Sequence, residues 1–249
     1  MINKYLKNPP IIEAVIGISV NKLFENEKEI ESAFESSHLR AIYTVHKKNQ
    51  TVLLKINEKD GSIIAQNVEG FVFSKENESL FLEKNRITLS DKNKYQSFED
   101  LSKKYEYIWN NVFPYIKNVN NKEIIDIGIK FVNKFDLTAK DINSNKFLIG
   151  PSISLEDKET KIKIGKLQEF FTIQKIVSDE YKAFANVKTI MKPVQNKKIQ
   201  CIFEIDVHDY EKMSLDFDRV KSVLNRLRSF KNSIFYANLP NAEEMEQFK

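Results

Sequence analysis

In the segment Ile199–His208, apolar residues at every odd position alternate with residues that are polar except for Ile202. Successive side chains of a β-strand point to opposite faces, so this segment predicts a strand with one buried face and one mostly polar face. A few residues later, apolar residues recur at helical spacing and predict a long helix over 215–232. A strand that leads into a long helix is therefore the unit around which the chain is organised.

The first half of the chain predicts a strand at Ile11–Val20, a short helix at Glu27–Ser36 and a long helix from Phe98 to Lys117. Pro114 should kink or end the long helix. Short strands separated by tight polar turns must pair antiparallel, because parallel pairs need long crossovers. These strands are predicted at 42–46, 51–56, 63–66, 70–74 and 79–83, with the first two forming a hairpin.

The second half repeats this layout. Its predicted strands lie at 124–135, 153–155, 169–177, 181–190 and 199–208, and its predicted short helices lie at 139–145 and 242–248. The segments Ile16–Val20 and Ile127–Phe131 share an apolar alternation with glycine at the second position. We therefore predict an α+β fold of two pseudo-repeated halves, 1–120 and 121–249. Each half would be an antiparallel sheet packed against a long helix, and both would share one core.

The single cysteine, Cys201, lies on the apolar face of its predicted strand. It allows no intramolecular disulfide, which is typical of a reduced cytoplasmic protein, and we expect it to be a small buried hydrophobe. The N-terminal residues lack the apolar stretch of a secretory signal. No segment approaches the roughly 18 apolar residues of a membrane helix, so we expect no membrane partner.

The motifs of several enzyme classes are missing from the sequence. There is no phosphate-binding glycine loop, dinucleotide-binding fingerprint, zinc-protease motif or serine-hydrolase elbow, and only 6 glycines occur. The three histidines and one cysteine lack zinc-ligand spacing. Glu204, Asp206 and His208 share one strand face and could serve a metal or a general base, but a solvated sheet face has the same pattern. We predict no catalytic residue, no metal site and no cofactor.

A polar patch is predicted where the two related strands carry polar side chains opposite their apolar faces. Its members are Glu13, Asp126, Lys130 and Asn133. Glycines in both strands, Gly17 among them, would leave room for a ligand or partner to approach. A structural ion pair, and an asparagine that forms a hydrogen bond at a strand end, would explain the same residues.

A second candidate surface is the basic face of the last helix, which carries Arg219, Arg226, Arg228 and Lys231. Clustered cations beside aromatic side chains are typical of nucleic-acid binding. Charge is spread evenly, however, with 17 basic and 16 acidic residues in 1–120 and 22 and 19 in the remainder. A solvated helix face is therefore the alternative interpretation.

The N-terminal run Pro9–Val15 and the strand Asp126–Asn133 resemble a sporadically distributed family of uncharacterised prokaryotic proteins of similar length. That family has a Pro-Pro-hydrophobic-Glu-Ala motif, a tryptophan in a mid-chain aromatic helix and then an Arg-hydrophobic-Gly-hydrophobic-Arg-aromatic-hydrophobic-Asn strand. The resemblance covers most of the chain, but Asp126 and Lys130 stand where the family has arginines. It implies an architecture and brings no established activity.

Three functions remain open. The first is a non-enzymatic binding or interaction protein, with a protein partner or a second copy of the chain, since the edges of antiparallel sheets need covering. The patchy occurrence of the family implies an accessory component of a bacterial stress or defence module. The second is nucleic-acid binding through the last helix. The third is a small-molecule cup between sheet and long helix, lined by Tyr105 and Trp109.

Overall fold

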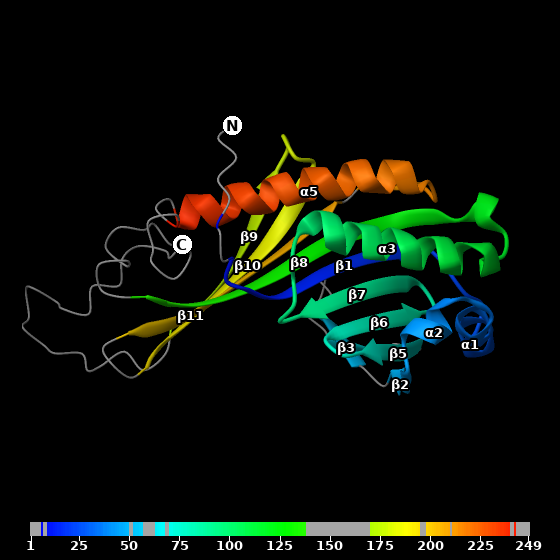
Figure 1. The fold of residues 1–249 in the computed structure, drawn as a ribbon. Coiled ribbons are helices and arrows are strands. Elements are labelled where there is room, and N and C mark those ends of the chain that lie inside the picture. The colour runs from blue at the N-terminus through cyan, green and yellow to red at the C-terminus, as the bar shows by residue number, and fades with distance from the viewer. Residues whose placement is uncertain are drawn as a thin grey trace, which may run out of the picture. The chain divides into compact units, whose positions relative to one another are not determined.

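The computed structural model describes residues 6, 9–49, 52–56, 63–67, 70–137, 170–194, 198–209, 211–239 and 242. It has an α+β architecture, as predicted, with a 10-stranded antiparallel sheet and helices packed on it (Figure 1). The predicted helix at 139–145 and the strand at 153–155 lie outside the described residues. The predicted helix at 242–248 also lies outside them, apart from its first residue.

The strands are β1 (Ile11–Val20), β2 (Val45–Asn49), β3 (Val52–Ile56), β4 (Ile63–Asn67), β5 (Gly70–Lys75), β6 (Glu78–Glu83), β7 (Arg86–Lys92), β8 (Glu123–Leu137), β9 (Phe170–Ser178), β10 (Ala183–Pro193), β11 (Ile199–Asp209) and β12 (Met213–Ser214). The helices are α1 (Glu27–Ser36), α2 (Leu39–Ile42), α3 (Phe98–Val112) and α5 (Phe217–Asn238), with the 3-10 turns η1 (Phe113–Tyr115) and η2 (Val119–Asn121). The order in the large sheet is β2-β5-β6-β7-β1-β8-β11-β10-β9; β12 pairs with β8, and β3 and β4 form a separate two-stranded sheet.

The chain divides into two compact units. Unit 1 comprises Met1–Glu13, Lys130–His208 and Asn225–Lys249, and unit 2 comprises Ala14–Ile129 and Asp209–Leu224. The long elements β1, β8 and α5 each contribute residues to both. The boundary predicted after residue 120 separates the two pseudo-repeated halves rather than these two units. The division into halves stays a prediction.

In unit 2, the strands β5, β6 and β7 bury one face of their meander. Phe73 pairs with Leu80, and Leu80 pairs with Leu89, so these three side chains share a face, and all are fully buried. Helix α1 packs on this face through Phe34, whose ring stacks on that of Phe73 with the centroids 3.6 Å apart. Apolar side chains at helical spacing in α1 and alternating ones in the strands therefore meet in one core.

Helix α3 begins at the predicted residue, Phe98, but it is shorter than the predicted span to Lys117. The Ser97 hydroxyl accepts a hydrogen bond from the Asp100 amide at 3.0 Å, as an N-cap should. The helix ends at Val112, just before η1, which contains Pro114. Its buried face holds Tyr105, whose hydroxyl donates to the Ile87 carbonyl of β7 at 2.8 Å. The helix is thereby fixed over β7.

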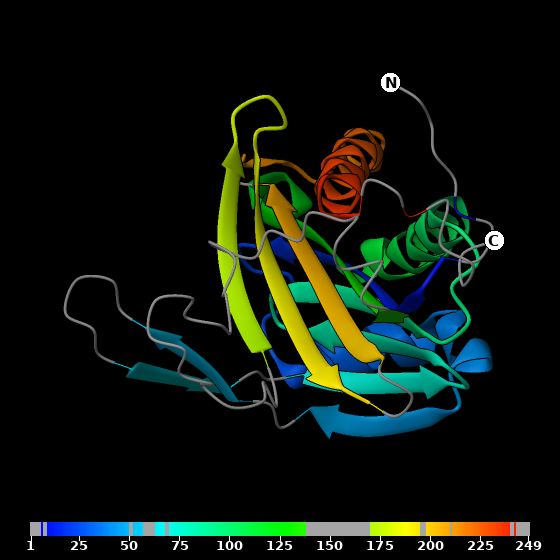
Figure 2. The same ribbon diagram turned by 90° about the vertical axis from the view of Figure 1, so that its left-hand side faces the viewer.

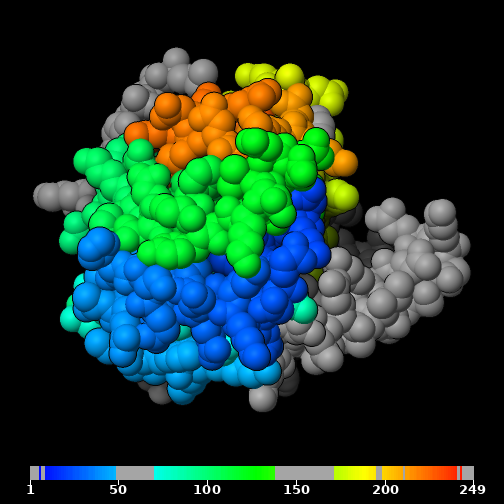
Figure 3. Space-filling model, turned by 90° about the vertical axis from the view of Figure 1, so that its right-hand side faces the viewer, coloured from blue at the N-terminus to red at the C-terminus, as the bar shows by residue number. Residues whose placement is uncertain are grey.

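The segment after α3 lies beside α1 in unit 2, as Figure 3 shows for the green and blue surfaces. Lys117 forms an ion pair with Glu29 at 2.7 Å, and the Tyr115 hydroxyl donates to the Ser36 carbonyl at 2.6 Å. These contacts connect residues 79 to 88 positions apart in the sequence. They hold both ends of α1 against the segment between α3 and β8.

In unit 1, the strands β9, β10 and β11 lie side by side, with the C-terminal half of α5 on one side of them (Figure 2). The side facing α5 is apolar: β11 contributes Cys201 and Phe203, both fully buried, and the Phe203 ring lies 6.3 Å from that of Phe235 in α5. Strand β10 presents mainly small residues to the same side, including Ala183 and Ala185. Small side chains allow a helix to approach the sheet closely.

Several predicted boundaries are wrong. Residues 42–46 were predicted as one strand, but α2 ends at Ile42 and β2 begins at Val45. The predicted hairpin between the first two short strands does not form, because β2 pairs with β5 and β3 pairs with β4. Strand β7 and the short strand β12 were not predicted, and α5 continues to Asn238 rather than ending near residue 232.

Within the described ranges, no helix has the length and apolar character needed to cross a membrane.

Candidate functional site

The structure brings two members of the predicted polar patch together. In unit 1, Lys130 Nζ lies 3.6 Å from Glu13 Oε2, and both side chains are partly exposed. This ion pair links β1 to β8 on the sheet face opposite their apolar residues. The pair matches the structural alternative that the sequence left open.

The third member of the predicted patch, Asp126, has a different partner in unit 2. Arg86 of β7 lies with its Nη1 atom 3.9 Å from Asp126 Oδ2. The Arg86 guanidinium occupies the space above Gly17, since a Cβ atom added there would lie 2.5 Å from Arg86 Nη2. The expected room for a ligand at Gly17 is therefore filled by this arginine.

Asn133, the fourth predicted member, lies on the opposite face of β8 and is 2% exposed. Its Nδ2 donates to the Phe203 carbonyl of β11 at 2.9 Å. A buried amide with this partner ties two strands together. Its place in the structure is that of a hydrogen-bonding strand residue, which was the alternative interpretation.

The four basic residues predicted on the last helix do not share one exposed face. Arg219 is exposed, whereas Arg226 and Arg228 are partly buried and engaged in further interactions. Lys231 is only 9% exposed, and its Nζ lies 4.3 Å above the centre of the Phe131 ring. An ammonium group in this position faces the core of unit 1 rather than solvent, which corrects the expectation that it contacts phosphate.

Burial, together with the smaller effect of the neighbouring Arg228 charge, lowers the pKa of Lys231 to about 7. The neutral amine is favoured because an ammonium group loses most of its hydration in an apolar surrounding. The Phe131 ring face offsets only part of that loss. Lys231 is therefore a titratable group within the packing of α5 on the sheet.

The predicted row Glu204, Asp206 and His208 does lie along one face of β11. His208 Nε2 is 3.1 Å from Asp206 Oδ1, and the imidazole stacks on Phe184 of β10 with the ring centres 5.1 Å apart. No group of three or more His, Cys, Asp or Glu side chains in the described part of the chain could hold a metal ion. The imidazole thus bridges a carboxylate and an aromatic ring.

The face of β9–β11 opposite α5, which we call the open face, is the surface that sequence reasoning missed. On β9 it exposes three large apolar side chains: Phe171 by 55%, Ile173 by 65% and Val177 by 63%. The register places these residues across from the even-numbered residues of β10. The open-face residues of β9 and β10 are Phe171, Ile173, Lys175, Val177, Phe184, Asn186, Lys188, Ile190 and Lys192.

Positive charge and aromatic rings alternate on the open face. Lys175 Nζ lies 5.0 Å from the centre of the Phe184 ring, and Lys188 Nζ lies 5.5 Å from that of Phe171. Each lysine reaches across to a ring on the neighbouring strand. No acidic residue of β9 or β10 lies on this face, although Glu204 and Asp206 do so on the adjacent β11.

One signal in the sequence could have found this surface. The segment Phe170–Ser178 carries apolar residues at both odd and even positions, so it lacks a clean polar face. An edge strand that is apolar on both faces has one face with no core to enter. The pattern was interpreted only as a strand.

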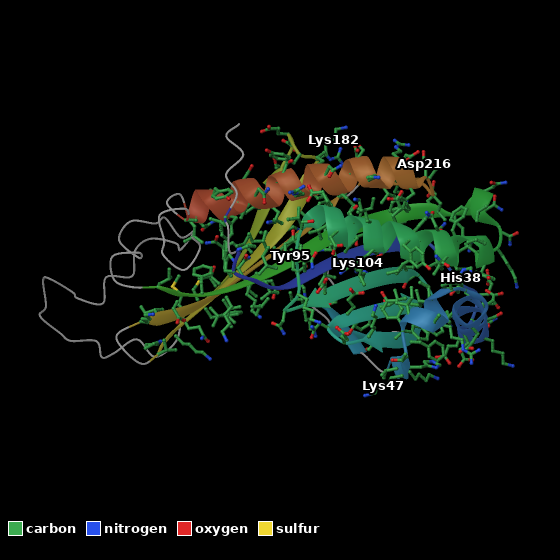
Figure 4. The ribbon with its side chains drawn as sticks, in the orientation of Figure 1. His38, Lys47, Tyr95, Lys104, Lys182 and Asp216 are labelled. Carbon is green, nitrogen blue, oxygen red and sulfur yellow. The ribbon has the colours of Figure 1, made fainter. Side chains whose placement is uncertain are left out.

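Unit 2 contains a charged cluster around Lys104 of α3, which is labelled in Figure 4. Its Nζ lies 2.8 Å from Glu78 Oε1 and 3.1 Å from both Asp91 Oδ2 and Asp100 Oδ2. The Asp91 side chain is 2% exposed, and none of the described residues forms a hydrogen bond with its Oδ1. Burial alone would lower the pKa of Lys104, but hydrogen bonds to the three carboxylates outweigh it and raise that pKa.

The residues predicted to line a small-molecule cup lie in the core of unit 2. Tyr105 is fully buried and Trp109 is 2% exposed, and both rings lie within 6.5 Å of the Phe217 ring, measured between centroids. Cys201 is fully buried, as predicted, and burial raises the pKa of its thiol to about 12. A thiol in this state is a poor nucleophile.

Comparison with protein-family models and with curated proteins finds no match for the chain.

Proposed function

We propose that this chain is a binding protein and that unit 1 binds single-stranded nucleic acid on the open face. The observation that carries the proposal is the pairing of Lys175 and Lys188 with exposed or partly exposed phenylalanine rings across β9 and β10. Proteins that bind single strands combine positive charge along the backbone path with aromatic rings on which bases stack.

The physical argument depends on what each group offers to a single strand. Phe171 is 55% exposed, so its ring can accept the face of a base. Lys175, Lys188 and Lys192 share the face with it and would meet phosphates, releasing condensed counterions. A duplex keeps its bases stacked and so cannot use the ring, which makes a single strand the better ligand.

The open face replaces the last helix as the proposed surface. Of the four helix residues named in the sequence analysis, Lys231 is buried and only Arg219 is exposed. Phosphate binding through α5 would therefore have to rely on side chains that already have other contacts. The expected role in a bacterial stress or defence module is part of the same proposal.

The two pseudo-repeated halves also remain a proposal, which the strand order supports. In the first half, the meander β5-β6-β7 returns to β1 and leads into α3. In the second half, the meander β9-β10-β11 returns to β8 and leads into α5. A duplication would explain why both series end beside their first strand.

We expect labelled single-stranded RNA or DNA oligonucleotides to bind in fluorescence anisotropy, and a duplex of the same sequence to bind more weakly. Phe171→Ala should weaken single-strand binding about tenfold, because stacking of a base on an aromatic ring contributes about 1–3 kcal/mol. Replacing Lys175 and Lys188 together by alanine should lower the salt slope by about 1.4, at roughly 0.7 per phosphate contact.

Lys47→Ala supplies the matched control, since this exposed lysine lies on β2 in unit 2 and should leave the affinity unchanged. A joint Arg226→Ala and Arg228→Ala variant separates the two candidate surfaces. If that variant lost binding at an unchanged melting temperature while Phe171→Ala bound normally, α5 would be the surface and the open-face proposal would be wrong. Failure of RNA and DNA alike to bind would reject nucleic acid as the ligand.

A further inference from the structure

The outer edge of β9 is the feature of unit 1 that the proposed function does not use. Strand β9 is the last in the order of the large sheet, and in the described part of the chain it pairs only with β10. It has 9 residues, and three of its open-face side chains are large, apolar and more than half exposed. An unpaired strand edge with apolar side chains favours pairing with another strand.

Strand β2, at the other end of the strand order, shows how an edge is normally protected. It has only 5 residues, and two of them are the exposed lysines Lys47 and Lys48. Short length and exposed lysines both disfavour pairing with another chain. Strand β9 is longer, with 9 residues, and Lys175 is the one lysine in it.

We infer that two copies of this chain pair through β9, edge to edge and antiparallel, with Gln174 opposite Gln174 of the partner subunit. This inference does not rest on the proposed function. Antiparallel pairing of identical strands has twofold symmetry, so one edge can serve both copies. The large sheet would then continue across the interface.

The sequence of β9 selects this register. Gln174 is the middle residue of Phe170–Ser178, so only this centre pairs all nine residues. Phe171 then lies opposite Val177 of the partner subunit, and Ile173 lies opposite Lys175 of the partner subunit. Centring the pair on Lys175 would oppose two like charges, and centring it on Ile173 would leave both Val177 side chains without a cross-strand neighbour.

The pairing has a consequence for the open face. Opposed residues of an antiparallel pair point to the same side of the sheet, so the open faces of the two copies would adjoin. Phe171 and Val177 would lose part of their present exposure through apolar cross-strand contact.

Native mass spectrometry over a concentration series should report a species of twice 29.1 kDa. Joint Ile173→Asp and Val177→Asp substitution should abolish that species and leave the far-UV circular dichroism spectrum of the folded chain unchanged, because both side chains are exposed. Ile125→Asp is the matched control: this isoleucine of β8 is also exposed, by 38%, and its replacement should leave the dimer intact.

Cysteine cross-linking tests the register, and Cys201 does not interfere because it is fully buried. Under mild oxidation Gln174→Cys should form a covalent dimer, since directly opposed Cβ atoms lie about 4.5–5.5 Å apart. Ile173→Cys and Lys175→Cys should each cross-link poorly alone and efficiently when mixed. Efficient self-linking of either variant with none at position 174 would overturn the inferred pairing. A monomer at every concentration would do the same and leave the edge for a different partner.

Discussion

Replacing Lys104 by methionine should lower the free energy of unfolding by about 2–4 kcal/mol, because it leaves a buried carboxylate without its counter-ion. Asp91 is the critical partner: its side chain is 2% exposed and Lys104 Nζ lies 3.1 Å from its Oδ2. The loss should fall below that of a wholly buried pair because Lys104 itself is 32% exposed. Urea unfolding followed by tryptophan fluorescence measures the change, since Trp109 lies on the same helix.

The pH dependence has a defined sign. The raised pKa of Lys104 means that the ammonium is favoured by folding. Its contribution is therefore complete below the ordinary pKa of lysine and is lost only as the pH rises through the higher folded-state value. Between neutral pH and pH 9, the titration of Lys104 should therefore leave the difference in free energy of unfolding between wild type and Lys104→Met constant.

Two further variants distinguish the effect of an uncompensated buried charge on stability from the effect of losing a surface ion pair. Asp91→Asn in the Lys104→Met background should recover part of the stability, because the uncompensated charge is removed. Lys94→Met removes an exposed pair with Glu76 and should leave the unfolding curve unchanged. Equal effects of Lys104→Met and Lys94→Met would show that burial of Asp91 plays no part.

The elements that were predicted correctly have a strong period and clear ends. Strand β1 and helix α1 have the bounds that their patterns predict, because prolines precede the strand and Asn26 caps the helix, its side chain accepting from the Glu29 amide. Pro114 was predicted to kink or end the long helix, and α3 ends two residues before it, although the helix was expected to reach Lys117. In each of these cases a local signal and the tertiary structure agree.

Two elements were mispredicted for reasons visible in their residues. Strand β7 was not predicted, because its buried face carries Asp91 and the apolar alternation therefore stops after Leu89; the Lys104 cluster makes the buried carboxylate favourable. Helix α2 has four residues, too few for a helical period to appear. Both depend on contacts with residues distant in the sequence.

The candidate surfaces were harder to predict than the fold. The alternation in β11 placed Glu204, Asp206 and His208 on one face, and the structure has them there. The open face of β9 was missed, because Phe171 and Ile173 have the character of core residues and the position of the strand at the sheet edge leaves them exposed. The only sequence signal for it was the lack of a clean polar face in Phe170–Ser178. The exposure of a helix face is equally hard to predict. Lys231 is a residue type typical of protein surfaces, but in the structure it is buried in the core of unit 1.

Replacing Lys231 by methionine should stabilise the protein at pH 7 and remove a pH dependence that the wild type shows. The folded-state pKa of about 7 lies below the ordinary value for lysine, so between pH 7 and about 10 the unfolded chain binds the extra proton. Wild-type stability should therefore rise with pH across this window, by on the order of 1 kcal/mol per unit relative to the variant. Differential scanning calorimetry at several pH values measures that difference. Lys221→Met, on the same helix with its side chain 50% exposed, should give no comparable change in slope. If wild type and Lys231→Met had parallel profiles from pH 7 to 10, the amine would be charged in the folded protein, and the apolar environment assigned to it would be wrong.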